Sequence, residues 1–243
     1  MVFSLFFAFF FLKKKKAIDF RPSQAREGLI NTIADILHVY KATFSANVSG
    51  ELVIPESLKM LPVYVLGMVK SPILRVAIGE RVDRRMHMLI SLNYMPYHRS
   101  VTFAYPKLYA AASAVPNKLS QQSLTESGGV VLLDTAHELL LLVARTADPG
   151  VLAHVFAVTS FEQVDPAAPL PLVDSPTSTQ LHETIAATRS RCATWARLTV
   201  IKEGEARWAE VMQWLVEDRM NQPPLPSFQE FVRQLQGLAS KQK

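Results

Sequence analysis

The chain has 243 residues, of which 49% are hydrophobic and 19% are charged. This composition excludes a disordered chain, and the length allows one large domain or two ordinary ones with a substantial core. The formal net charge is +5, but four consecutive lysines at residues 13–16 supply most of it. The rest of the chain is close to neutral, so a general attraction to nucleic acid has little support. The single cysteine, Cys192, excludes an intramolecular disulfide and a thiolate zinc cluster, and it fits a reducing compartment such as the cytosol.

Residues 1–16 form an unusual start, in which the apolar run MVFSLFFAFFFL precedes the four lysines. A secretory signal places its positive charge before the apolar run, and a membrane-spanning helix needs roughly 20 apolar residues. Two interpretations remain open. The segment is either a short anchor at the membrane surface or a non-native start translated from upstream sequence. We expect residues 1–16 to be an unstructured or non-native extension.

Residues 17–118 are expected to form an all-helical domain. Apolar residues recur at helical spacing from residue 21 to residue 44, with Pro22 suited to the first helical position. A second helix is expected to open near Pro55, to be kinked by Pro62 and to end before Pro72. A third is expected over residues 82–94.

Residues 119–243 are expected to form a mixed sheet flanked by helices, so the fold class of the whole chain is α+β. Residues 130–134 and 138–145 predict a β-hairpin, although the intervening residues 135–137 lack the Asn-Gly or Asp-Gly that favours a tight turn. Ser227 and Glu230 have the spacing of a helix capping box. The other expected elements are helices over 148–158, 181–191, 205–220 and 228–238, a loop over 165–179 and a strand over 197–202.

The sequence contains no recognisable catalytic, cofactor-binding or metal-binding motif. It has no phosphate-binding glycine loop and no Gly-x-Ser-x-Gly nucleophile turn. The pairs His137-Glu138 and His182-Glu183 resemble the start of a zinc-protease motif, but Leu141 and Ala186 stand where the second histidine is required. We therefore expect no enzymatic activity, no catalytic residues, and no cofactor or metal.

Arg81, Arg84 and Arg85 form the one basic cluster in the body of the chain. Arginines grouped in this way could contact a phospholipid headgroup or an acidic partner protein. The alternative is an ordinary solvated helix start. These three residues are the candidates for a membrane or partner contact.

Several segments, taken in order, resemble the COPII vesicle-coat cargo-adaptor subunits of the Sec23/Sec24 family, and the likeness is to the Sec24 type. The words that carry the resemblance are QAREGLINTIADILHVYKA at 24–42, LKMLPVYVLGMVKSPILR at 58–75, YPKLY at 105–109, GGVVLLDTAHELLLLVART at 128–146, FAVTSFEQVDP at 156–166 and LVEDRM at 215–220. The helix at 227–238 also fits. The resemblance implies a C-terminal helical domain followed by a gelsolin-like domain.

The resemblance implies a structural and adaptor part of the COPII coat, which carries protein cargo from the endoplasmic reticulum to the Golgi. It implies a cytoplasmic location, peripheral on the endoplasmic-reticulum membrane at exit sites and on vesicles. The implied partners are other coat subunits, above all the GTPase-activating one, and no nucleic acid. The family's zinc finger, trunk and β-sandwich would precede Ala17, so neither the zinc, the cargo sites nor the main subunit interface transfers to a residue here.

Two other classes of function remain open. A gelsolin-like module could act alone and bind actin or phosphoinositides, although a shared fold does not fix a function. An unrecognised enzyme is the third class. The hairpin also departs from the family, because residues 135–137 and 142–144 replace the expected Asn-Gly or Asp-Gly turn and the expected Trp-Val-Gly strand end.

Overall fold

The computed structural model describes residues 21–44, 56–75, 81–192, 195–221 and 223–241. The expectation for residues 1–16 lies outside the described residues. The chain divides into two compact units, Met1–Tyr97 with Arg219–Lys243, and His98–Asp218. We call them the helical unit and the sheet unit, and each is described by itself.

The helical unit consists of helices, and several of them begin and end close to the positions predicted from the sequence. Helix α2 covers Pro22–Phe44 and begins at the proline, as expected. A short 3-10 turn, η2 (Glu56–Leu58), precedes α3 (Leu61–Lys70), and α4 covers Val82–Tyr94 as predicted. Helix α10 (Phe228–Lys241) comes from the other end of the chain. The helices predicted over residues 21–44 and 82–94 are therefore confirmed, whereas the second helix begins at Leu61 instead of near Pro55.

The predicted kink at Pro62 is wrong. Pro62 lies in the first turn of α3, where its missing N–H would have no helical partner in any case. The end of α3 is as predicted, because Ser71 before Pro72 has an extended backbone at φ −63° and ψ 154°.

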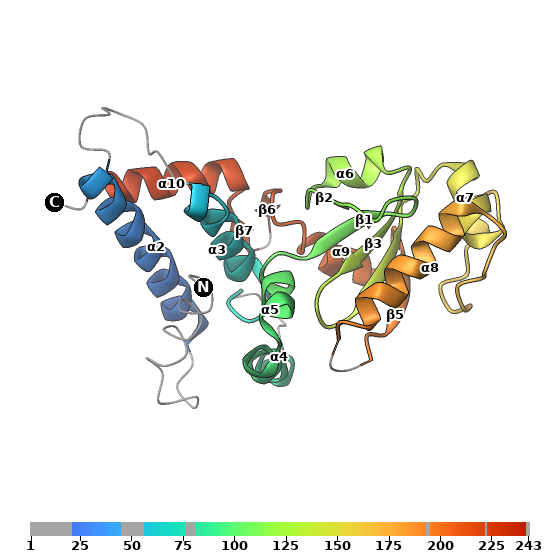
Figure 1. Cartoon of the computed structure of the whole chain (residues 1–243), viewed down its shortest axis with the longest axis horizontal. Helices are drawn as coiled ribbons and strands as arrows, with labels where there is room; N and C mark the ends of the chain where they lie inside the picture. Colours follow the sequence, from blue (N-terminus) through green and yellow to red (C-terminus); the bar gives the residue numbers. More distant parts are fainter. Residues whose placement is uncertain (1–20, 45–55, 76–80, 193–194, 222, 242–243) are drawn as a thin grey trace. The chain divides into compact units, whose positions relative to one another are not determined.

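Helices α2, α3 and α10 pack against one another and bury a shared apolar core. Helix α3 is apolar on nearly all sides, which fits its central place in this unit (Figure 1). His38 on α2 contacts α10 through its Nδ1 atom, 2.8 Å from the carbonyl of Ala239. The buried apolar residues of the three helices include Leu29, Ile33, Leu37, Val65, Leu66, Val69, Phe231, Leu235 and Ala239.

The start of α10 carries the predicted capping box. The backbone N–H of Ser227 donates to Glu230 Oε2 at 2.8 Å, and the N–H of Glu230 donates to Ser227 Oγ at 3.3 Å. The two-residue strands β6 (Met220–Asn221) and β7 (Pro224–Leu225) pair just before it. Each side chain of the box thus satisfies a backbone donor that the helix leaves free.

The sheet unit contains a five-stranded mixed sheet in the order β2-β1-β3-β4-β5 (Figure 1). Its strands are β1 (Lys107–Ala110), β2 (Pro116–Asn117), β3 (Val130–Asp134), β4 (Leu139–Val143) and β5 (Leu198–Lys202). The hairpin β3–β4 is antiparallel and confirmed, and β4–β5 is parallel, which makes the sheet mixed as predicted. The α+β fold class is therefore confirmed.

Both faces of the sheet are covered, which explains its continuous runs of leucine and valine. Every residue of β3 and β4 is buried. One face packs against α7 (Pro149–Phe156) and α8 (Pro176–Arg189) through Leu152, Val155, Leu181 and Ile185. Helix α9 (Ala206–Met212) lies on the opposite side of the sheet from α8 (Figure 1).

Four details differ from expectation. Helix α8 begins at Pro176, inside the loop expected over residues 165–179. Residues 107–117, expected within the helical domain, form β1 and β2 and pair in the sheet, so the division falls near residue 98 instead of residue 118. Residues 219–243 group with the helical unit, since α10 packs on α2 and α3. Helix α9 ends at Met212 instead of residue 220: the N–H groups of Trp214 and Leu215 donate to carbonyls three residues earlier, and that of Glu217 donates to the carbonyl of Leu119 at 3.1 Å.

The hairpin turns without a glycine. Ala136 takes the left-handed conformation at φ 71°, which a non-glycine residue adopts only at a cost in backbone strain. Hydrogen bonds made by Asp134 and Thr135, two residues of the candidate functional site, hold this residue in place.

Substitution of Ser227 tests the role of the capping box at the start of α10. We expect Ser227→Ala to lower the free energy of unfolding by about 1 kcal/mol in urea titrations, because it leaves a backbone donor unsatisfied. The N–H of Ser227 lowers the pKa of the Glu230 carboxyl below its usual range, and Arg219 at 3.2 Å contributes to the same shift. A depressed carboxyl pKa means that this stabilisation is present at neutral pH and is lost as the pH falls through the folded pKa.

The matched control is Gln229→Ala, on the exposed side of the same helix, which should change stability by less than about 0.5 kcal/mol. Glu230→Gln should flatten the acid limb of the stability profile. Equal stability of the wild type and Ser227→Ala would contradict the capping account.

Candidate functional site

A buried ion pair joins a helix to the end of a central strand in the sheet unit. Arg99 belongs to α5 (Tyr97–Ala104), and Asp134 is the last residue of β3. Arg99 Nη1 lies 2.7 Å from Asp134 Oδ2 and Arg99 Nη2 lies 2.9 Å from Oδ1, so the two groups meet in a bidentate fork. Their side chains are only 5% and 3% exposed. The pair is therefore almost completely removed from water.

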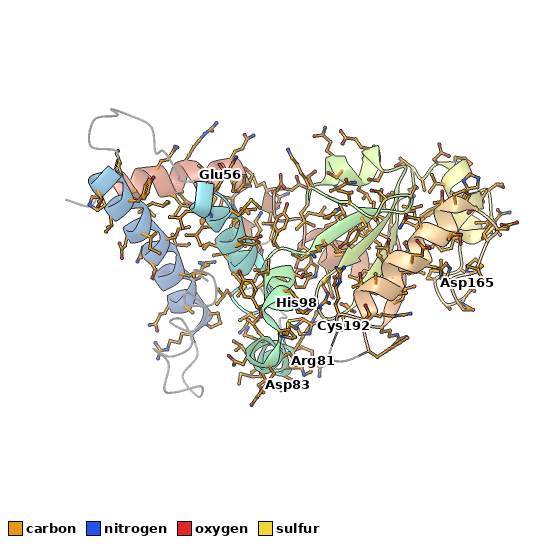
Figure 2. The ribbon with its side chains drawn as sticks, in the orientation of Figure 1. Glu56, Arg81, Asp83, His98, Asp165 and Cys192 are labelled. Carbon is orange, nitrogen blue, oxygen red and sulfur yellow. The ribbon has the colours of Figure 1, made fainter. Side chains whose placement is uncertain are left out.

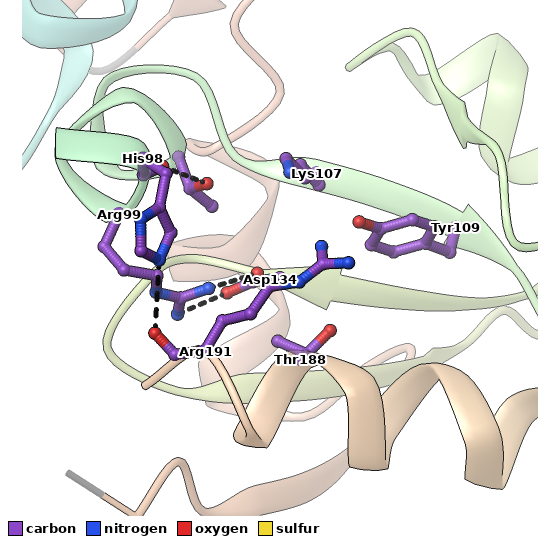
Figure 3. Close-up of a pocket in the computed structure, with 8 residues that line it drawn as sticks. His98, Arg99, Lys107, Tyr109, Asp134, Thr188 and Arg191 are labelled. Atoms are coloured by element: carbon purple, nitrogen blue, oxygen red, sulfur yellow. Dashed lines mark hydrogen bonds and ion pairs between the residues drawn. The ribbon is translucent and has the colours of Figure 1, made fainter. Parts of the chain in front are cut away.

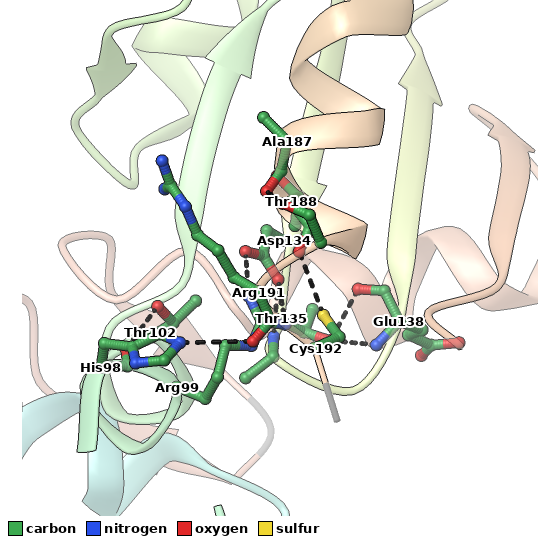
Figure 4. A network of polar contacts seen from close by, with 12 residues as sticks. His98, Arg99, Thr102, Asp134, Thr135, Glu138, Ala187, Thr188, Arg191 and Cys192 are labelled. Atoms are coloured by element: carbon green, nitrogen blue, oxygen red, sulfur yellow. Dashed lines mark hydrogen bonds and ion pairs between the residues drawn. The ribbon is translucent and has the colours of Figure 1, made fainter. Parts of the chain in front are cut away.

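The carboxylate of Asp134 also organises the hairpin turn (Figure 4). Its Oδ1 atom accepts the backbone N–H of Ala136 at 2.9 Å. Thr135 closes the turn from the other side, where its hydroxyl donates to the carbonyl of Glu138 at 3.1 Å and accepts the N–H of Glu138 at 3.2 Å. These bonds fix the left-handed Ala136 without a glycine.

A polar pocket of about 370 Å³ opens beside the pair, within the sheet unit (Figure 3). Four structural elements line it: α5, β1, the end of β3, and α8 together with the residue that follows its C-terminal turn. The lining residues are His98, Arg99, Thr102, Lys107, Tyr109, Asp134, Thr188 and Arg191. Because two strands and two helices form its walls, the pocket is a rigid part of the fold.

One contact joins two walls of the pocket, and a second lies within the segment that ends α8. The imidazole of His98 donates from Nε2 to the carbonyl of Arg191 at 3.3 Å, which joins α5 to the end of α8. The thiol of Cys192 donates to the carbonyl of Thr188 at 3.3 Å. Burial raises the pKa of the Cys192 thiol, and the Asp134 carboxylate raises it further against the opposing effect of Arg99. Cys192 therefore stays a neutral thiol and is poorly suited to act as a nucleophile.

The pocket presents donors of hydrogen bonds. Burial raises the pKa of the Tyr109 phenol, and the Asp134 carboxylate adds to that shift while Arg191 and Arg99 oppose it. The phenol is therefore protonated at neutral pH and can donate. Figure 3 shows its hydroxyl pointing toward the side of the pocket where Lys107 and Arg191 lie.

The structure places the three arginines predicted as contacts at the start of α4, in the helical unit. Arg81 is the exposed N-cap residue (Figure 2). Arg85 turns inward, where its Nη2 donates to the carbonyl of Arg75 at 3.1 Å and its Nε donates to that of Pro72 at 3.4 Å. Arg84 is half-buried. Arg85 is thus engaged within the chain, and a membrane or partner contact through this cluster stays a prediction.

The described residues contain no cluster of the side chains that most often bind metals. No three of their histidine, cysteine, aspartate and glutamate side chains gather at a distance suited to a metal ion. None of the helices in the described ranges has the length and apolar character needed to cross a bilayer. Glu217 and Asp218 each accept a hydrogen bond from a residue about 100 positions earlier in the sequence. Glu217 Oε1 accepts the hydroxyl of Tyr105 at 2.7 Å, and Asp218 Oδ2 accepts the N–H of Gln121 at 2.7 Å.

Sequence reasoning singled out none of the residues that line the pocket. One signal was available, since Asp134 ends a run of buried valine and leucine and a buried carboxylate requires a partner. The identity of that partner had no comparable signal, because Arg99 lies 35 positions earlier in a short helix that the apolar spacing does not reveal.

Comparison with known proteins identifies relatives of both units. Residues 10–102 match the Sec23/Sec24 helical domain. The human protein transport protein Sec24C is 28% identical over 203 residues, which cover 80% of this chain and 19% of the relative. SEC24 C of Arabidopsis thaliana is 26% identical and covers 91% of this chain and 22% of its own length. The chain thus spans about a fifth of the length of these relatives.

A solved structure gives the same result. The crystal structure of the human COPII-coat protein Sec24c superposes with a TM-score of 0.79 at 25% sequence identity. The match covers 90% of this chain and 30% of that one. The likeness therefore includes the sheet unit as well as the helical unit.

Removal of one member of the buried pair tests its structural role. We expect Arg99→Met to lower the free energy of unfolding by about 3–5 kcal/mol, because the carboxylate of Asp134 is left buried without a counter-ion. The double variant Arg99→Met/Asp134→Leu should recover part of that loss, since it removes both charges. Urea unfolding of the full chain measures both.

The matched control is Arg207→Met, which removes the partner of Glu138 from an ion pair that is 42% and 30% exposed. This change should cost no more than about 1 kcal/mol. A loss for Arg99→Met no larger than that for Arg207→Met would show that the buried pair does not organise the unit.

Proposed function

The chain belongs to the Sec23/Sec24 family, and we propose from this that it is a structural and adaptor part of the COPII coat in the transport of protein cargo from the endoplasmic reticulum to the Golgi. The observation that carries the proposal is the extent of the match, which includes 80–91% of the chain for relatives named as protein transport proteins. A match to one short motif would support the fold alone.

The helical unit offers a surface suited to binding another protein. Val82, Ile90 and Tyr94 lie on one side of α4, at positions i, i+8 and i+12, and are 66%, 54% and 84% exposed. We call these three residues the α4 stripe. A run of large apolar side chains in water is typical of a surface that meets a partner. On this proposal the partner is another coat subunit, and the coat itself is cytoplasmic and peripheral to the endoplasmic-reticulum membrane.

The role that we propose is one of binding and support, without catalysis. Arg99 and Asp134, the two charged side chains that the sheet unit buries, neutralise one another and are used in the architecture. The gelsolin-like character of the sheet unit is part of the same proposal. Binding of actin or phosphoinositides stays an alternative, and no contact in the described residues favours it.

A variant of the α4 stripe tests the proposal in cells. The tagged full chain should concentrate at endoplasmic-reticulum exit sites and should precipitate with COPII subunits identified by mass spectrometry. Ile90→Ser/Tyr94→Ser should reduce the recovery of coat subunits by about tenfold, because each truncation at the centre of an interface typically costs more than about 1 kcal/mol. Val39→Ser is the matched control, since Val39 is 62% exposed on α2 and lies outside the stripe.

An even distribution through the cell, without coat subunits in the precipitate, would contradict the proposal. Calcium-dependent cosedimentation with actin would favour the alternative instead. Equal recovery by the two serine variants would leave the coat role standing and exclude the α4 stripe as its contact surface.

A further inference from the structure

Two cations line the pocket of the sheet unit without an acidic neighbour of their own. Lys107 lies on β1 and is half-buried, and Arg191 follows the end of α8 and is exposed. Among the described residues, neither side chain forms an ion pair or a hydrogen bond. Two other cations of this unit, by contrast, are engaged. Lys202 Nζ donates to the carbonyl of Val164 at 2.8 Å, and Arg189 Nε donates to a backbone carbonyl at 3.1 Å.

The acidic residue of the pocket does not cancel these charges. The fork of Arg99 already neutralises Asp134, whose Oδ1 atom also accepts the N–H of Ala136. Lys107 and Arg191 therefore give the pocket a net charge of +2. Tyr109 and Thr188 add two hydroxyl groups that form no hydrogen bond within the described residues.

We propose that this pocket binds a phosphate group on a side chain of a partner peptide. A phosphorylated side chain carries close to two negative charges at neutral pH and three strong acceptor oxygens. Two cations and two hydroxyl donors match that number of charges and acceptors, whereas a carboxylate offers one charge and two oxygens. The planar fork of Arg191 is suited to two phosphate oxygens at once.

The shape of the pocket favours a peptide over a membrane. The lining residues enclose about 370 Å³ between α5, β1 and α8, and Lys107 is half-buried within that space (Figure 3). A single extended side chain can enter such a recess, whereas a flat bilayer contacts residues that protrude from a protein's surface. The choice of a protein as the carrier of the phosphate rests on the proposed function in a coat.

Binding of defined probes to the full purified chain tests the proposal. The probes are a fluorescein-labelled pentapeptide with a central phosphoserine, the same peptide with serine or glutamate at the centre, inorganic phosphate, and phosphatidylcholine vesicles with and without a phosphatidylinositol monophosphate. Fluorescence anisotropy follows the peptides, and flotation follows the vesicles. We expect the phosphoserine peptide to bind at least about tenfold more tightly than the serine and glutamate peptides.

Substitutions within the pocket locate the binding. Lys107→Gln and Arg191→Gln should each weaken binding of the phosphoserine peptide by about tenfold, because each removes a charge-assisted contact. Lys118→Gln and Arg197→Gln are matched controls at exposed positions of the same unit, outside the pocket, and should bind as the wild type does. An unchanged melting midpoint of the two pocket variants shows that loss of binding is not loss of fold.

Several results would overturn the proposal. One is that the phosphoserine peptide does not bind the chain, and another is that the glutamate peptide binds as tightly as the phosphoserine peptide does. A third is that the pocket variants bind the phosphoserine peptide as tightly as the wild type does. The last is that the chain binds phosphoinositide vesicles or inorganic phosphate but not the peptide. The test uses no coat subunit. Failure of the pocket proposal therefore leaves the coat role intact, and failure of the coat role in cells leaves the binding result as it stands.

Discussion

The burial of two opposite charges at one point is the constraint on which the sheet unit depends. Arg99 and Asp134 are removed from water at a considerable desolvation cost, which only a bidentate fork and further hydrogen bonds offset. The same carboxylate holds the N–H of Ala136, so one side chain fixes both the docking of α5 and the turn of the hairpin. The pocket follows from this arrangement, because α5 supplies one of its walls and the neutralised carboxylate leaves the remaining cations unopposed.

The remainder of the architecture is apolar and suits a support. The strands β3 and β4 are buried along their whole length between α7 and α8 on one face and α9 on the other. In the helical unit, α3 is buried along nearly all its length and packs against α2 and α10. Contacts with other molecules are therefore left to the surface, and among the described residues the α4 stripe and the polar pocket both resemble binding sites.

Local patterns in the sequence predict much of this fold and little of the candidate site. Helical spacing predicts α2 and α4, and the capping box at Ser227 predicts the start of α10, because these signals lie within a few residues of one another. The kink predicted at Pro62 is wrong, since the effect of a proline depends on which turn of the helix it occupies. The strand β1 is only four residues long and becomes a strand through pairing with β3, which no local pattern encodes. The partner of Asp134 comes from a distant helix, so the site depends on tertiary structure.

Hydrogen exchange at one backbone amide tests the role of the ion pair most directly. Ala136 and Ala167 both donate to the Oδ1 atom of an aspartate two residues earlier, at 2.9 Å in each case. Only the first aspartate is buried and paired with an arginine. If the pair organises the unit, the amide of Ala136 exchanges as slowly as the strand amides of β3 and more than about 100-fold slower than that of Ala167 in the native wild-type chain. Similar exchange rates for Ala136 and Ala167 would contradict the account.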